Sequence, residues 1–107
     1  MEPKNTVYIL RSESNRSRHY TGLTSDLDKR LKWHNAGQNV DTARDRPWML
    51  VVAFHFADER IARRFERYLK SGSGREFAKR HFGDIPATKA FGLKIADSKS
   101  VIVSADR

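Results

Sequence analysis

One nearly unbroken apolar run, Trp48–Phe56, constrains the fold of this 107-residue chain more than any other feature. Because the run lacks regular polar alternation, it predicts a strand that is covered on both faces of a sheet. With 38% hydrophobic residues, the chain can bury one modest core and has no room for a second. We therefore expect a single domain with helices on both sides of a central sheet.

Two further strands are predicted before this run. Residues 6–11 are rich in β-branched and aromatic side chains, and a polar turn at 12–17 separates them from a hairpin partner at 19–21. Gly22 then stops the partner strand, at a turn where a positive φ or a close backbone approach requires glycine. The predicted fold class is α/β, in the α+β sense: a small single domain with a central three-stranded, mainly antiparallel sheet flanked by helices.

The helices are predicted from caps and periodicity. A first helix spans residues 26–36, with Thr24, Ser25 or Asp26 as its cap and Gly37 at its end. A second helix spans residues 59–70, follows a cap at Asp58 and carries an apolar stripe centred on Phe65. Residues 39–46 are expected to form a loop, residues 72–74 a break and residues 75–81 a short helix. The apolar run at 101–103 is either disordered or adds an edge strand.

The charge of the chain favours a polyanionic partner. It has 21 Lys and Arg residues against 13 Asp and Glu, a formal charge of +8 and a pI near 10.2. Nucleic acid is the first candidate. No apolar run approaches the roughly 20 residues that a spanning helix needs, so no membrane partner is expected. The absence of cysteine and of a visible signal peptide fits a reducing, cytoplasmic location.

An ordered set of residues resembles the GIY-YIG nuclease domain. The set comprises Thr6-Val7-Tyr8, then Tyr20-Thr21-Gly22, then Arg30 eight residues after the glycine, and a lone Glu66 in a later helix. The chain is most similar to small single-domain proteins related to the UvrC N-terminal domain and to Slx1-like endonucleases. The resemblance covers residues 6–82, so we expect a nuclease-like domain at 1–83 and a C-terminal tail of uncertain order at 84–107.

The resemblance implies a divalent-metal-dependent DNA endonuclease that hydrolyses backbone phosphodiesters, with a role in DNA repair or recombination. Glu66 would hold Mg²⁺ (or Mn²⁺), and Arg30 would contact the scissile phosphate through its planar fork of donors. Other readings remain open for each residue. Glu66 could be a solvated partner of Lys70, with Glu59 as the fallback ligand, and Arg30 could be an ordinary exposed arginine.

Tyr8, Tyr20 and His34 would take part in transferring the proton of the attacking water. We assign Tyr8 as the proton acceptor, His34 as its relay, and Tyr20 as the group that orients water or phosphate; the tyrosine roles can be exchanged. Because a phenol has a pKa near 10, nearby cations would have to favour the phenolate. Each tyrosine could instead be a core residue with a satisfied hydroxyl, and His34 could be a helix-end histidine favoured by the dipole.

Other residues are assigned to nucleic-acid binding or to structure. Trp33 lies opposite the apolar stripe of its helix and would stack on a base or cover a loop. Residues 72–75 form either an anion-binding nest or a plain linker between helices. Gly22 is assigned a structural role. The residues expected to bind the DNA backbone, or else to form a solvated face, are Lys29, Arg46, Lys70, Arg75 and Lys79.

Departures from the family pattern motivate two rival functions. The first tripeptide lacks the family's glycine, both tripeptides lack the central isoleucine, and residues 76–80 contain no asparagine. A non-catalytic nucleic-acid-binding protein that retains the nuclease fold is the main alternative. A basic structural or ribosome-associated protein is a third. If the protein is a nuclease, a protein partner is expected to supply its specificity.

Overall fold

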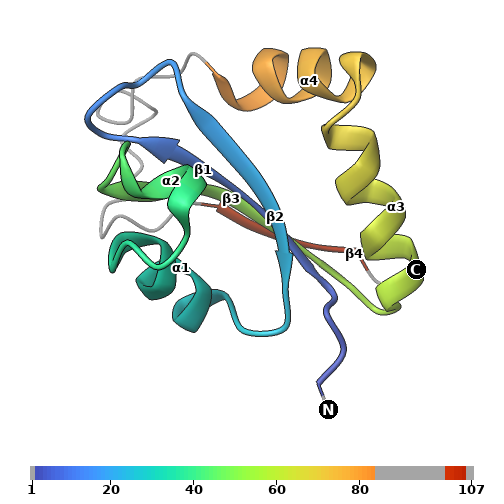
Figure 1. Ribbon diagram of the computed structural model, residues 1–107. Helices are drawn as coiled ribbons and strands as arrows, with labels where there is room; N and C mark the ends of the chain where they lie inside the picture. The colour runs from blue at the N-terminus through green and yellow to red at the C-terminus, as the bar shows by residue number, and fades with distance from the viewer. Residues whose placement is uncertain (1, 84–100, 106–107) are drawn as a thin grey trace.

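The computed structural model describes residues 2–83 and 101–105, which form a twisted sheet with helices on both faces (Figure 1). The strand order is β2-β1-β3-β4. The three-stranded antiparallel sheet predicted from the sequence is confirmed, and a fourth strand joins it parallel to β3. The strands are β1 (Thr6–Ser12), β2 (His19–Thr24), β3 (Trp48–Phe56) and β4 (Val101–Ala105).

The register of β1 against β2 gives Gly22 a position that differs from the prediction. β2 continues to Thr24, so Gly22 lies inside the strand and pairs directly with Tyr8. A strand can extend past a glycine when its ladder partners hold it, and the antiparallel pairing with β1 does so here. The helix begins only after Thr24, whose hydroxyl accepts from the Asp26 N–H at 3.0 Å.

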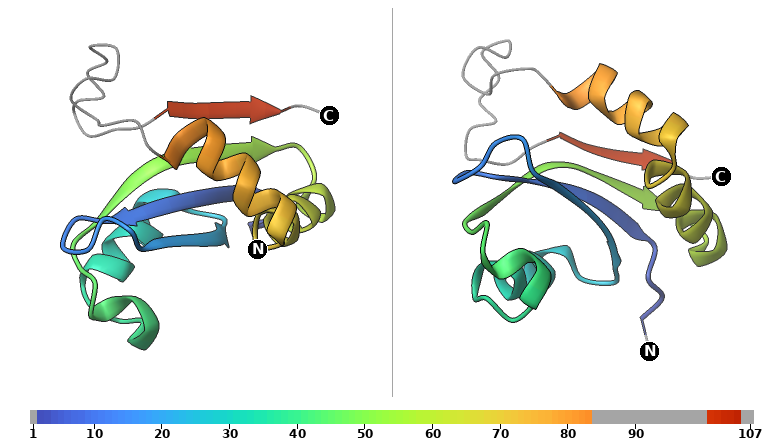
Figure 2. Two further views of the ribbon diagram at one scale, coloured as in Figure 1. Left: turned by 90° about the horizontal axis from the view of Figure 1, so that it is seen from above. Right: turned by 45° about the horizontal axis from the view of Figure 1, so that its top comes forward.

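Helices cover the two faces separately (Figures 1 and 2). The first pair follows β2, and the second pair, with a π-helical turn, follows β3. Two predictions fail here. The expected loop contains a short helix because the Asn39 side chain accepts from the Asp41 N–H, and the expected break begins a helix because Ser71 caps it. The elements are α1 (Leu27–Asn35), α2 (Val40–Ala43), α3 (Glu59–Leu69), α4 (Gly72–Ala78) and η1 (Lys79–Gly83).

The alternation of β1 divides the core into two clusters. Side chains at 7 and 9 face α3, and those at 8 and 10 face α1. On the α3 face, Phe65, Phe77 and Phe82 pack against a buried cluster that contains Val7, Ile9, Val52, Phe54, Ala62 and Leu69. On the α1 face, Leu27 and Leu31 pack against Tyr8, Leu10, Trp48 and Ala53. The run Trp48–Phe56 therefore contributes to both clusters, as its lack of alternation predicted.

Two glycines have positions that a side chain would disturb. Gly37 follows α1 with a φ of 80°, as expected for a left-handed residue at a helix end. Gly74 is buried in α4, and a Cβ there would collide with the Tyr68 carbonyl and lie 2.6 Å from the Leu69 Cα. The segment at 72–75 therefore serves close packing between α3 and α4.

Candidate active site

A buried chain of hydrogen bonds joins β1 to α1 and α2. The Tyr8 hydroxyl lies 3.0 Å from His34 Nε2, and His34 Nδ1 lies 2.9 Å from Thr42 Oγ1. All three side chains are at most 1% exposed. His34 reaches this position because it follows Leu27 and Leu31 at helical spacing, on the face of α1 that packs against the sheet.

The contacts of Thr42 favour one tautomer of the His34 imidazole. The Thr42 hydroxyl donates its hydrogen to the Asn39 carbonyl at 3.5 Å, which leaves its oxygen to accept from His34 Nδ1–H. A neutral imidazole then has a lone pair at Nε2, which accepts from the Tyr8 hydroxyl. His34 is thus oriented to receive the proton of Tyr8.

Burial controls the ionisation of this pair. It raises the pKa of Tyr8 above its ordinary value, Tyr20 adds to the rise, and the Arg30 guanidinium opposes it. Burial also lowers the pKa of His34, and Arg30 lowers it further. Both groups are therefore neutral near pH 7. The expected phenolate does not form on Tyr8 in the protein alone, because the charge of Arg30 does not offset the cost of burying an anion.

Tyr20 contacts this pair from the more open side. Its ring centroid lies 4.7 Å from that of His34 and 6.2 Å from that of Tyr8, and the residue is only partly buried. Gly22 is the reason that the tyrosines fit. A Cβ at Gly22 would lie 2.5 Å from Tyr8 Cζ and 2.9 Å from its Cε1, so the ring of Tyr8 occupies the space above the glycine.

Arg30 lies beside the aromatic cluster on α1. Its Cζ is 4.6 Å from the centroid of the Trp33 ring, a cation–π arrangement that holds the guanidinium. Its charge affects both Tyr8 and His34. The guanidinium forms no ion pair with any carboxylate in residues 2–83, so it is available to an anion.

Glu66 approaches the same cluster from α3, which otherwise covers the opposite face. α3 also contacts the edge strand β2, and the Glu66 carboxylate is close enough to contribute to the raised pKa of Tyr8. Its Oε2 forms an ion pair with Lys70 Nζ at 2.8 Å, and the side chain is 19% exposed. The pairing with Lys70 that the sequence also allowed is therefore present, together with a position near the tyrosine.

The donor set suits a hard cation that keeps most of its water. Glu66 Oε1 has no hydrogen bond or ion pair with the part of the chain that the structure describes, which leaves one carboxylate oxygen open. Among those residues, no cluster of three His, Asp or Glu side chains has a metal-binding arrangement. Mg²⁺ is commonly bound by one or two carboxylates plus substrate phosphates, so a single oxygen fits this ion.

The predicted DNA-contacting residues fall in two regions. Lys29 is exposed on α1. Arg46 is exposed near the C-terminal end of this helix, with its guanidinium against Gly37 and its Nε donating to the Ala43 carbonyl at 2.8 Å. Lys70, Arg75 and Lys79 lie on the other side of the sheet, around a cavity. The structure therefore brings Tyr8, Tyr20 and His34 into contact, and the charges of Arg30 and Glu66 act on Tyr8. The predicted basic residues are separated into two groups.

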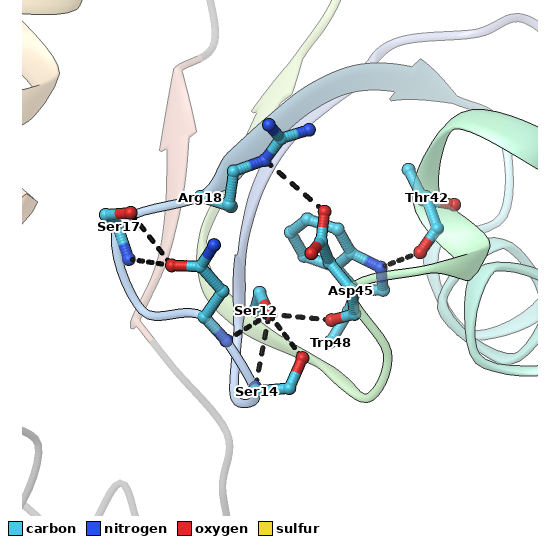
Figure 3. Close-up of polar contacts among 8 residues, drawn as sticks. Ser12, Ser14, Ser17, Arg18, Thr42, Asp45 and Trp48 are labelled. Carbon is cyan, nitrogen blue, oxygen red and sulfur yellow. Dashed lines mark hydrogen bonds and ion pairs between the residues drawn. The ribbon is translucent and has the colours of Figure 1, made fainter.

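Sequence reasoning missed the residues that support His34. Trp48 Nε1 donates to the Thr42 carbonyl at 2.8 Å, as Figure 3 shows, and Asn35 binds both backbone groups of Trp48. These contacts hold α2 and α1 against the start of β3. Thr42 carried no usable signal, because its role depends on a helix that the sequence did not predict.

Comparison with known proteins agrees with this geometry. Residues 4–80 match the family described as the GIY-YIG catalytic domain, which is most of the chain. A family match of this extent defines the class of the fold. The chain therefore belongs to the GIY-YIG family of nuclease domains.

Individual proteins with similar sequences cover large parts of the chain. The chain is 38% identical over 71 residues to UPF0213 protein BH0048 of Halalkalibacterium halodurans, which is 65% of this chain and 73% of that protein. It is 40% identical over 67 residues to UPF0213 protein CPE1444 of Clostridium perfringens, 62% and 70% of the two chains. It is also 42% identical over 62 residues to the structure-specific endonuclease subunit SLX1 of Candida dubliniensis, 52% of this chain but only 22% of that protein. No solved structure gave a significant match.

Within residues 2–83 and 101–105, every helix is too short or too polar to cross a bilayer.

Proposed function

We propose that this protein is a divalent-metal-dependent DNA endonuclease. The observation that supports it most is the hydrogen bond from Tyr8 to His34, which is influenced by the positive charge of Arg30 and the negative charge of Glu66. Arg30 acts on both members of the bonded pair, and Glu66 acts on the tyrosine. A phosphodiester needs a proton acceptor, a cation for the developing charge and a metal ligand, and these side chains supply all three.

Arg30 would bind the scissile phosphate. A guanidinium presents donors in a planar fork that matches two phosphate oxygens, and the cation–π contact with Trp33 restricts where this guanidinium can lie. Glu66 would hold Mg²⁺ or Mn²⁺ through its open oxygen. The bound ion would polarise the phosphate and neutralise part of its charge.

Tyr8 and His34 would accept the proton of the attacking water as a relay. As the water oxygen forms its bond to phosphorus, its proton passes to the Tyr8 oxygen, and the proton of Tyr8 passes to His34 Nε2. The bond from phosphorus to the leaving oxygen breaks, and solvent protonates that oxygen. Because Tyr8 gives up one proton while it gains another, no free phenolate is required. Tyr20, on the open side, would orient the water. The two tyrosines can exchange the roles of proton relay and water-orienting group.

The substrate and the biological setting are part of the proposal. A formal charge of +8 suits a DNA backbone. The name of the Candida relative, a structure-specific endonuclease subunit, supports an endonuclease that recognises the structure of its substrate and works with a protein partner. A role in DNA repair or recombination is a further part of the proposal. The proposal also includes a cytoplasmic location and a domain boundary near residue 83. The DNA backbone would be contacted by Lys29, Arg46 and Lys70.

A nicking assay on supercoiled plasmid and on branched oligonucleotides tests this function. We expect wild-type protein to nick DNA with Mg²⁺ or Mn²⁺ and not with EDTA. Glu66→Gln should reduce the rate at least about 100-fold, since it removes the charge of the metal ligand. Glu76→Gln is the matched control, because Glu76 is exposed on α4 and outside the site.

The rival function gives a different pattern. A non-catalytic nucleic-acid-binding protein would bind the same DNA with salt dependence but would not nick it with any metal. Nicking that Glu66→Gln and Arg30→Gln leave unchanged would reject the proposed site.

A further inference from the structure

A concave site lies on the α3 face of the sheet, opposite the face that carries His34. It has a volume of about 730 Å³ and is enclosed by the β1–β2 turn, the edge strand β2, the end of α3, α4 and η1. Figures 1 and 2 show α4 at the same end of the sheet as the β1–β2 turn. This size falls within the roughly 300–1,000 Å³ of pockets that enclose a small organic ligand.

The rim of this cavity is strongly basic. It carries Arg16 from the turn, Lys70 after α3, Arg75 on α4 and Lys79 on η1, and no carboxylate is among the described lining residues. Lys70 is paired with Glu66, whereas Arg16, Arg75 and Lys79 form no ion pair with the described part of the chain. Unpaired cations around one hollow favour a ligand with more than one negative charge.

The floor of the cavity is apolar. Ile9, Val51, Leu69 and Phe82 line it beneath the basic rim. A simple phosphate would gain nothing from such a floor, whereas a ligand with a flat apolar body and a phosphate at each end would use both parts. A nucleotide within a DNA strand has this construction.

The base of that nucleotide has to be unpaired. In a duplex each base is stacked on both sides and paired, so it cannot turn into a pocket without being extruded. A single-stranded segment offers its bases freely and leaves its phosphates to the rim. The shape and charge of the cavity therefore fit single-stranded DNA rather than duplex.

The cavity adjoins the proposed catalytic site. Tyr20 lines the cavity and also contacts the ring of His34, and Lys70 lines it while its ammonium group binds Glu66. One continuous strand could therefore pass from Arg30 and Glu66 into the cavity within a few nucleotides.

The turn that supplies Arg16 is held in place by the α2–β3 connection. Ser12 Oγ donates to the Asp45 carbonyl at 2.6 Å, and Arg18 Nε lies 3.3 Å from Asp45 Oδ2 (Figure 3). Asp45 is 7% exposed. This side of the cavity is therefore anchored before any ligand binds.

We propose that this cavity binds an unpaired nucleotide of the DNA substrate, with its base on the apolar floor and its phosphates on Arg16, Arg75 and Lys79. The inference rests on the proposed nuclease function for the identity of the substrate. It makes the enzyme select substrates that carry an unpaired nucleotide close to the cleaved linkage.

The test measures binding without catalysis. A fluorescein-labelled oligothymidylate and a blunt duplex of equal length are titrated with wild-type protein in EDTA over a series of salt concentrations. The test variant is Arg75→Gln/Lys79→Gln, and the charge-matched control is Arg64→Gln/Arg67→Gln, at exposed positions of α3 outside the cavity. For the oligothymidylate, the slope of log K against log salt should fall by roughly 0.7 per lost phosphate contact in the test variant only.

A crosslinking experiment locates the base. An oligothymidylate with one 5-iododeoxyuridine is irradiated with the wild-type protein, and the crosslinked peptide is identified by mass spectrometry. Crosslinks at Phe82 support the cavity, and crosslinks confined to Trp33 or Tyr20 overturn it. Equal slopes in the two double variants overturn it as well.

The outcomes separate the two proposals. If the slope of log K against log salt falls in the test variant only and the wild type never nicks DNA, the cavity binds single strands and the nuclease function fails. If the wild type nicks DNA with metal and the test variant binds oligothymidylate like the control, the nuclease function stands and the cavity assignment fails.

Discussion

Tyr8 and Gly22 lie directly opposite each other on β1 and β2, and the phenol ring of Tyr8 fills the space above the glycine. The absence of a side chain at Gly22 is what allows the Tyr8 hydroxyl to reach His34 at 3.0 Å. The glycine of the second motif tripeptide therefore acts through the tyrosine of the first.

Replacing this glycine should damage both stability and activity. In Gly22→Ala the new methyl group would overlap Tyr8, and overpacking of this kind costs roughly 1–3 kcal/mol in the free energy of unfolding. Gly72→Ala is the control, because a Cβ there meets nothing within 4 Å. Urea denaturation and the nicking rate measure the effects; a Gly22→Ala protein with wild-type stability and rate would contradict the proposed contact.

Thr42 should act as a positioning residue for His34. Thr42→Val removes the acceptor of His34 Nδ1–H and leaves a buried donor unpaired, at a cost of about 1–3 kcal/mol, whereas Thr42→Ser keeps the hydroxyl. Nitrogen-15 NMR of the imidazole should show the Nδ1–H tautomer in the wild type and in Thr42→Ser. A change of tautomer and a slower nicking rate are expected only in Thr42→Val, and an unchanged tautomer there would refute the assignment.

Arg30 should be needed for its shape as well as its charge. Arg30→Lys keeps the positive charge that lowers the pKa of His34 but loses the planar fork and the stacking on Trp33. We expect kcat to fall roughly 100-fold, as for the loss of one transition-state donor, with little change in thermal stability. Lys29→Arg, on the next residue of α1, is the control and should leave kcat within a factor of two or so. Full activity in Arg30→Lys would show that a point charge is enough.

The pH dependence should follow the lowered pKa of His34. Protonation of Nε2 removes the acceptor of the Tyr8 proton, so the nicking rate should decline on the acid side only below the ordinary histidine pKa of 6.5. Stability follows the same equilibrium. As the pH falls, the unfolded chain binds a proton at this histidine before the folded protein does. The contribution of His34 to the free energy of unfolding is therefore fully present above about pH 6.5 and is lost as the pH falls through the lower folded-state pKa.

The control for this dependence is His34→Gln, which removes the titrating group. Its free energy of unfolding should lose the component that declines between about pH 6.5 and the lower folded-state value. The same fall in the wild type and in His34→Gln would assign the effect to other groups. Tyr8→Phe and Tyr20→Phe test which phenol passes the proton to His34. Only the variant that lacks this phenol should lose the decline of the nicking rate at low pH.

Local patterns predicted much of the fold. The cap at Asp58, the glycine after α1 and the apolar stripe around Phe65 are confirmed, because each depends on neighbours within a few residues. α2 was missed because four residues carry almost no periodic signal. The residues of the candidate site were found through their order and spacing, and their chemistry was only partly anticipated, since burial raises the pKa of Tyr8 where cations were expected to lower it.

The sequence by itself determined the alternating strands and helices and the positive charge, since periodicity and composition are properties of the chain alone. The five polar residues of the candidate site were predicted from the resemblance to a known family. Only the tertiary structure decided that Gly22 makes room for Tyr8, that Thr42 orients His34, and that the charge of Glu66 acts on Tyr8 from the helix on the other face. These relationships join residues that are distant along the chain. They depend on strand register and helix packing, which no local pattern records.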